Sequence, residues 1–182
     1  QASDDFFSSA DLGAELGGLP IDLAFIDGMH QFEFALRDFM NVERYSTWTS
    51  VIVFDDMLPR DIDEAARDRH TKFWAGDVFK VIDVLRRYRP DLVVLPVGTE
   101  PTGTLVVIGA DPADRVLERA YDEIVREQAV RAAVRKRQDR LGTRLRPKLL
   151  GPLHPLISAW YSLPLSRRLR PKLLGPLHPL IQ

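Results

Sequence analysis

Two short apolar runs that each end in aspartate constrain the fold of this chain most strongly. The first reads IDLAFID and ends at Asp27, and the second reads SVIVFDD and ends at Asp55 and Asp56. Between them, Phe32–Tyr45 has apolar residues at three- and four-residue spacing, which is typical of a helix packed on a sheet. We therefore predict a β-α-β unit. Its right-handed crossover makes the two strands parallel and brings the three aspartates to one edge of the sheet, where ligands of open α/β sheets bind.

Both strands of this unit, Ile21–Ile26 and Ser50–Phe54, are almost continuously apolar, so we expect them to be buried on both faces of the sheet. The stretch Met57–Gly76 is long and polar, and a segment of that length between core elements is often a lid or a substrate loop. The other predicted elements are a short helix within Ser9–Leu16, a helix over Asp77–Tyr88 capped by Asp77, an antiparallel hairpin of Leu92–Val97 and Thr104–Ile108, and a long helix over Pro112–Arg140.

Charge separates the chain into an acidic body and a basic tail. Residues 1–110 hold 10 Lys and Arg against 19 Asp and Glu, whereas residues 141–182 hold 7 basic residues and no acidic one. In this tail the 14-residue sequence RLRPKLLGPLHPLI occurs twice, and its prolines predict that it is not a continuous helix. We expect a body at 1–110, a long helix at 111–140 and the tail at 141–182. A solvated extension explains the tail better than binding to lipid or nucleic acid, because it lacks amphipathic periodicity and nucleic-acid motifs.

Composition excludes several classes of protein. The chain has no cysteine, so disulfides and thiolate metal sites are excluded. No apolar run approaches the roughly 20 residues that span a bilayer, and the first residues lack the pattern of a secretion signal. These features predict a soluble protein of the cytoplasm.

The three aspartates have two readings. A single Asp often closes a strand and caps the next helix, and turn chemistry alone explains it. Three together crowd like charges at one strand end, which is unfavourable unless a cation or a proton relieves it. Oxygen ligands without thiolates favour Mg²⁺ over softer metals. His30 lies three residues after Asp27. It is either a solvent-exposed histidine at a helix start or a base that takes the proton of a metal-activated hydroxyl.

The strings IDLAFIDGMHQFEFALRDF and SVIVFDDMLP resemble the second half of a class I S-adenosylmethionine-dependent methyltransferase, of the metal-dependent small-molecule O-methyltransferase kind. The resemblance covers about residues 1–110. It implies a partial Rossmann-like, doubly wound sheet made of strands 4–7 of that fold, with the last hairpin antiparallel. The glycine-rich cofactor loop and the acid that holds the cofactor ribose would lie before Gln1. The sheet would then expose the edge at which the first strand of that fold pairs, so the resemblance implies that the chain forms a homo-oligomer through this edge.

The resemblance also implies roles for particular residues. Asp27, Asp55 and Asp56 match the acids that hold Mg²⁺ in metal-dependent relatives, and His30 matches their catalytic base. Ser3 and Asp4 match positions that flank the adenine of S-adenosylmethionine, and Asp27 is expected to contact the cofactor as well. The substrate would be a small molecule with a hydroxyl group, such as a sugar or a catechol.

Two functions follow as alternatives. The first is a methyltransferase region that transfers a methyl group to a small hydroxylated acceptor with Mg²⁺ assistance, and that is incomplete without the cofactor-binding half. The second is an inactive methyltransferase-like fragment that acts as a binding or assembly module, with the basic tail as its interacting part. Affinity for S-adenosylmethionine and Mg²⁺ discriminates between the two.

Overall fold

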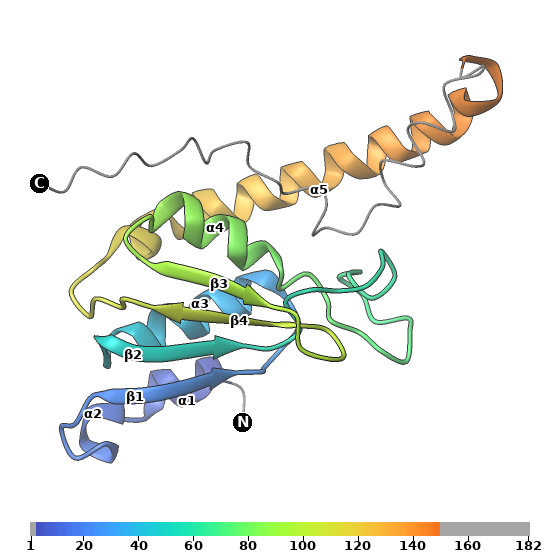
Figure 1. Cartoon of the computed structure of the whole chain (residues 1–182). Helices are drawn as coiled ribbons and strands as arrows, with labels where there is room; N and C mark the ends of the chain where they lie inside the picture. The colour runs from blue at the N-terminus through green and yellow to red at the C-terminus, as the bar shows by residue number, and fades with distance from the viewer. Residues whose placement is uncertain (1–2, 150–182) are drawn as a thin grey trace, which may run out of the picture. The chain divides into compact units, whose positions relative to one another are not determined.

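The computed structural model describes the backbone of residues 3–149 and the side chains of residues 3–134. The chain divides into two compact units, Gln1–Arg131 and Ala132–Gln182. The first unit contains a four-stranded mixed sheet and the helices packed against it (Figure 1). Residues 150–182, which include the whole second copy of the duplicated sequence, lie outside the described residues. The predicted three-part division at residues 110 and 140 stays a prediction.

The predicted β-α-β unit is confirmed. Strand β1 (Ile21–Ile26) pairs in parallel with β2 (Ser46–Phe54), and helix α3 (Phe32–Glu43) connects them. Residues Leu23 to Ile26 lie opposite Val51 to Phe54, so Asp27 and Asp55 leave the sheet side by side. The predicted edge of the sheet therefore carries the aspartates.

The predicted hairpin is also confirmed. Strands β3 (Val93–Val97) and β4 (Thr104–Ile108) pair antiparallel, and β4 pairs antiparallel with β2. The sheet order is β1-β2-β4-β3, so β1 and β3 are its edges. Because Phe54 lies opposite Leu105, the turn between β3 and β4 lies at the same end of the sheet as Asp56.

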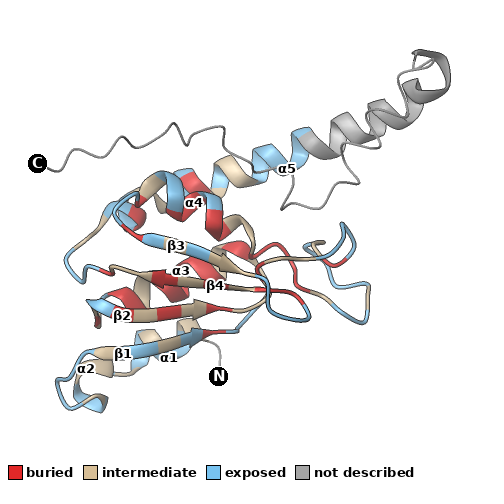
Figure 2. Cartoon of the chain, viewed as in Figure 1, coloured by how far each residue is buried: buried red, intermediate tan, exposed pale blue. Residues whose placement is uncertain are grey.

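The prediction that the strands are buried on both faces is wrong, whereas the partial doubly wound arrangement stays a prediction. Helix α3, helix α4 (Lys80–Tyr88) and the start of helix α5 (Val116–Leu149) contribute to one core. That core covers one face of the sheet. On the other face, the outer strands are exposed: Leu23 is 67%, Phe25 60%, Val93 57% and Leu95 54% accessible to solvent (Figure 2). Helices on one side only leave every second residue of β1 and β3 uncovered.

The first helices of the chain and the last one differ from the prediction. The first helices are α1 (Ser3–Ser9), which was not predicted, and α2 (Leu12–Glu15), which is capped by Asp11. Helix α5 ends at Leu149, beyond the predicted Arg140 and within the first copy of the duplicated sequence. The rest of that copy lies outside the described residues, so the prediction that it is not one continuous helix stays a prediction.

Asp77 does not cap α4, which begins at Lys80 with Phe79 at the N-cap position and no side-chain cap hydrogen bond. Its Oδ1 instead accepts a hydrogen bond of 2.8 Å from the backbone amide of Phe32, the first residue of α3. The carboxylate of Asp77 and the amide of Phe32 are 45 residues apart in sequence, and the fold brings them together.

Candidate active site

Asp27, His30 and Asp56 form one cluster at the carboxyl end of β1 and β2. One ligand atom from each of the three side chains lies within 4.8 Å of the others. His30 Nε2 is 3.5 Å from Asp27 Oδ1 and 3.2 Å from Asp56 Oδ2. The structure thus brings together two of the three predicted aspartates and the predicted base.

The ring of His30 is held in one orientation by Trp74. The backbone carbonyl of Trp74 accepts from His30 Nδ1 at 2.7 Å, and the two rings stack with centroids 5.1 Å apart. Because a carbonyl oxygen has no proton to give, Nδ1 carries the hydrogen, and the second nitrogen of a neutral ring has only a lone pair. That lone pair faces two carboxylates, so a proton or a metal cation between these groups satisfies all of them.

Asp56 is positioned by the turn between β3 and β4. Thr102 Oγ1 donates to Asp56 Oδ1 at 2.6 Å, and the amides of Met57 and Leu58 donate to the carbonyls of Gly103 and Thr102. Asp56 itself has a φ of 60°, a left-handed conformation that aspartate adopts more readily than most residues. Sequence reasoning missed Thr102, and only the register of β4 against β2 brings it near the site.

Asp55 is not part of the cluster, although it was predicted to hold the metal with Asp27 and Asp56. Its Oδ1 accepts from the backbone amide of Asp56 at 2.9 Å. All three aspartates and His30 nevertheless line one small cavity of about 10 Å³. A space of that size holds about one water molecule or one ion.

The donor set fits a divalent cation. Two carboxylates supply the oxygen ligands that Mg²⁺ prefers, and His30 Nε2 lies beside them with its lone pair available as a base. The metal-binding role of Asp27, Asp55 and Asp56 remains a prediction.

Ser3 and Asp4, the predicted cofactor residues, belong to helix α1. Both carboxylate oxygens of Asp4 accept from the guanidinium group of Arg37, at 3.0 and 2.6 Å. Arg37 also donates to the hydroxyl of Tyr121. This network fixes α1 on α3 and on the start of α5, and the contact of Ser3 and Asp4 with a cofactor stays a prediction.

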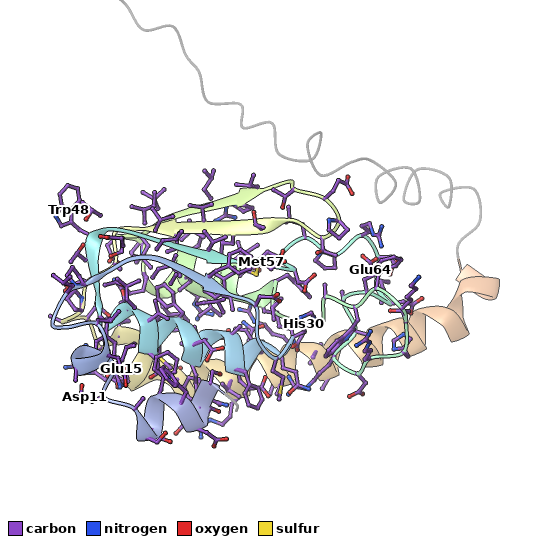
Figure 3. The ribbon with its side chains drawn as sticks, turned by 90° about the horizontal axis from the view of Figure 1, so that it is seen from below. Asp11, Glu15, His30, Trp48, Met57 and Glu64 are labelled. Carbon is purple, nitrogen blue, oxygen red and sulfur yellow. The ribbon has the colours of Figure 1, made fainter. Side chains whose placement is uncertain are left out.

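A larger pocket of about 360 Å³ opens beside the cluster. Figure 3 shows His30 near this end of the sheet and Trp48 at the opposite end. The polar stretch Met57–Gly76, which the sequence indicated as a lid or a substrate loop, contributes to the pocket. Its lining residues are Gly28, Met29, His30, Asp56, Arg69, Lys72, Phe73, Trp74, Pro101 and Thr102.

The arrangement can bind a cation, accept a proton and enclose a small molecule beside both. Within the described part of the chain, no helix has the length and hydropathy to cross a membrane. A comparison with curated proteins finds no match. Residues 2–57, which contain Asp27, His30, Asp55 and Asp56, match a family model described as a methyltransferase domain, and this match supports a methyltransferase domain and methyl transfer in general.

Proposed function

We propose that this region transfers a methyl group from S-adenosylmethionine to a hydroxyl group of a small molecule, with Mg²⁺ assistance. The observation that carries the proposal is the convergence of Asp27, His30 and Asp56 beside a pocket of about 360 Å³. The match to a methyltransferase domain over residues 2–57 supports the same reaction class.

The residues of the cluster have distinct roles in this proposal. Asp27 and Asp56, with Asp55 in the same small cavity, would hold the cation. When bound, S-adenosylmethionine supplies the methyl group and Mg²⁺ lowers the pKa of the acceptor hydroxyl. His30 accepts the hydroxyl proton at Nε2, because the carbonyl of Trp74 keeps the hydrogen of the ring on Nδ1. With that proton on His30, the acceptor oxygen would be able to take the methyl group, and the sulfur of the cofactor would be the leaving group.

The positioning groups keep these side chains in place. Thr102 donates to Asp56 and leaves its other oxygen directed at His30. The ring of Trp74 covers one side of His30 and also lines the pocket. We propose that Ser3, Asp4 and Asp27 contact the cofactor. The hydroxylated acceptor is proposed to bind in the larger pocket.

The experiment is isothermal titration of the chain with Mg²⁺ and, separately, with S-adenosylmethionine. We expect a Mg²⁺ site that Asp27→Asn and Asp56→Asn each weaken by at least tenfold, since each removes one charged ligand. Asp22→Asn is the matched control, because Asp22 is exposed on the same strand as Asp27 but outside the cluster. Equal Mg²⁺ heats for all four proteins would overturn the metal role.

The alternative function is a binding or assembly module, and the uncovered apolar face of the sheet favours it. That function predicts no measurable affinity for S-adenosylmethionine and no methylated product. Formation of S-adenosylhomocysteine in the presence of a catechol, and its loss in His30→Gln, would exclude it.

A further inference from the structure

Two basic side chains in the wall of the larger pocket have no acidic partner among the described residues. Arg69 makes one long hydrogen bond, 3.4 Å, to the backbone carbonyl of Lys72. The ammonium group of Lys72 lies 5.6 Å from the centre of the Phe73 ring. Both residues line the pocket that also contains His30 and Asp56.

Arg69 and Lys72 belong to the segment Met57–Gly76, whose other two arginines are paired with acidic side chains. Arg60 pairs with the buried Glu64, and Arg67 pairs with Glu33 and lies 3.4 Å from Asp77. These pairs hold the segment in place and leave neither guanidinium free for a ligand. Arg69 and Lys72 are therefore the cations of this segment that remain available.

The segment is fixed where it approaches the site. The amides of Ala75 and Gly76 both donate to the carbonyl of Glu64 at 3.0 Å. The indole of Trp74 donates to the carbonyl of Ala66 at 2.5 Å. A wall held by such bonds presents its side chains with little ordering cost on binding.

Charge makes the pair unusual. Residues 1–110 carry only 10 basic side chains against 19 acidic ones. Two cations without an acidic partner among the described residues are therefore unexpected in this pocket wall, and an uncharged or cationic ligand would not require them. Arginine and lysine bind carboxylate and phosphate groups through charge-assisted hydrogen bonds. In the same lining, the Lys72 ammonium group lies 5.6 Å from the centre of the Phe73 ring, and the Trp74 ring stacks on His30.

We propose that the acceptor is anionic: Arg69 and Lys72 bind its carboxylate or phosphate group while its hydroxyl faces His30. This inference rests on the proposed function for the identity of the ligand as a methyl acceptor. It assigns the substrate class as a small hydroxylated ring compound with one acidic group.

The experiment compares 3,4-dihydroxybenzoate with catechol, which differ by one carboxylate. Isothermal titration should give about tenfold tighter binding of the benzoate to the wild-type chain, the effect of one charge-assisted contact. The double variant Arg69→Gln/Lys72→Gln should bind both compounds equally. Arg86→Gln is the control, because Arg86 is exposed on α4 and outside the pocket. It should keep the preference.

Each outcome decides a different point. Equal affinity of the wild-type chain for both compounds, or a preference that survives in the double variant, overturns the anion site and leaves the proposed methyl transfer standing. A preference that the double variant loses, without any S-adenosylhomocysteine formed, supports the anion site and contradicts methyl transfer by this chain alone. Binding of neither compound overturns the inference. Displacement of the benzoate by inorganic phosphate in the wild-type chain, and not in the double variant, supports the same anion site.

Discussion

At the scale of single residues, the buried carboxylate of Asp38 is the most unusual group. It lies on α3 beneath the end of β1, where a methyl group added to Gly28 would come within 3.3 Å of its Oδ2. Asp38 is 6% exposed, and its Oδ1 has no hydrogen-bond partner among the described residues. Burial raises the pKa of Asp38 above its ordinary value of 3.8. The folded chain therefore holds the protonated form more tightly than the unfolded chain does.

Replacing this carboxylate should stabilise the protein at neutral pH. We expect Asp38→Asn to raise the free energy of unfolding at pH 7 by about 1 kcal/mol, the scale of one unsatisfied buried group. The gain should vanish below the ordinary pKa, where both states are protonated, and grow as pH rises through the raised pKa of the folded state. Urea unfolding at about pH 3 and pH 7 measures it, with Asp22→Asn as an exposed control. A destabilised Asn variant at pH 7 would mean that the carboxylate has a partner.

At the scale of elements, Gly76 joins the segment that follows β2 to the histidine of the site. It has a φ of 65°, and a Cβ added there would lie 1.8 Å from the backbone oxygen of His30. The next residue, Asp77, donates its amide to that same oxygen at 3.2 Å. The closure of the segment on the site therefore requires a residue without a side chain.

This close approach predicts a large effect of one methyl group. Gly76→Ala should lower the free energy of unfolding by about 3 kcal/mol or more, because it adds a backbone clash to the strain of a left-handed alanine. Gly18→Ala is the matched control: its φ is 77° and nothing lies within 4 Å of an added Cβ, so it should cost only about 1 kcal/mol. Thermal unfolding measures both. Equal losses would show that His30 yields to the new side chain.

The elements that the sequence pattern predicted well are those whose apolar period matches a single packed face. The bounds of β1, Ile21–Ile26, and the start of α3 at Phe32 agree with the prediction. Contacts between distant parts of the chain were not predictable in this way. Asp77 binds the amide of Phe32, and Thr102 reaches Asp56, because tertiary packing and strand register place them there.

The same division holds for the candidate site. Asp27 and His30 are three residues apart, so one strand end brings them together. The different geometry of Asp55 and Asp56 depends on the left-handed φ of Asp56, which no pattern of residue types reveals. Continuous apolar sequence also predicted two covered faces, yet the described residues cover only one.

At the scale of the first unit as a whole, one buried arginine connects its helices. Arg89 follows α4, is 1% exposed, and contacts Glu43 of α3 at 2.7 Å, Asp91 before β3 at 2.8 Å and Asp114 before α5 at 3.3 Å. Burial raises the pKa of Glu43, and the bond to Arg89 opposes that rise. Without the guanidinium, Glu43 would be left as an uncompensated buried charge.

Loss of this arginine should weaken the entire unit. We expect Arg89→Met to lower the free energy of unfolding by about 3–5 kcal/mol, the cost of breaking a buried ion pair from one side. Arg87→Met is the control, because Arg87 and Glu127 form an exposed pair worth about 0–1 kcal/mol. Chemical denaturation at pH 7 compares them. A loss near that of the control would mean that Glu43 takes up a proton and adapts.

The uncovered face of the sheet is the feature on which the last prediction rests. Its side chains form two apolar rows across all four strands, and Phe25 stands in the second of them. The rows are Leu23, Val51, Ile108 and Val93, and Phe25, Val53, Val106 and Leu95. Monomeric proteins rarely leave such a continuous apolar surface in water. This face adjoins the free edge of β1, where the homo-oligomer was predicted.

We therefore expect the chain to self-associate through this surface. Light scattering after size-exclusion chromatography, over a series of concentrations, should give a mass above that of one chain. Phe25→Glu should shift the mass toward the monomer, because a carboxylate in each copy would be buried without a partner. Ile62→Glu is the control, since Ile62 is an equally apolar and exposed residue that lies outside the sheet. A wild-type chain that is monomeric at every concentration contradicts the prediction. If Phe25→Glu and Ile62→Glu both lower the mass, the association depends on exposed apolar side chains in general. Association through the uncovered face of the sheet requires that only Phe25→Glu lowers the mass.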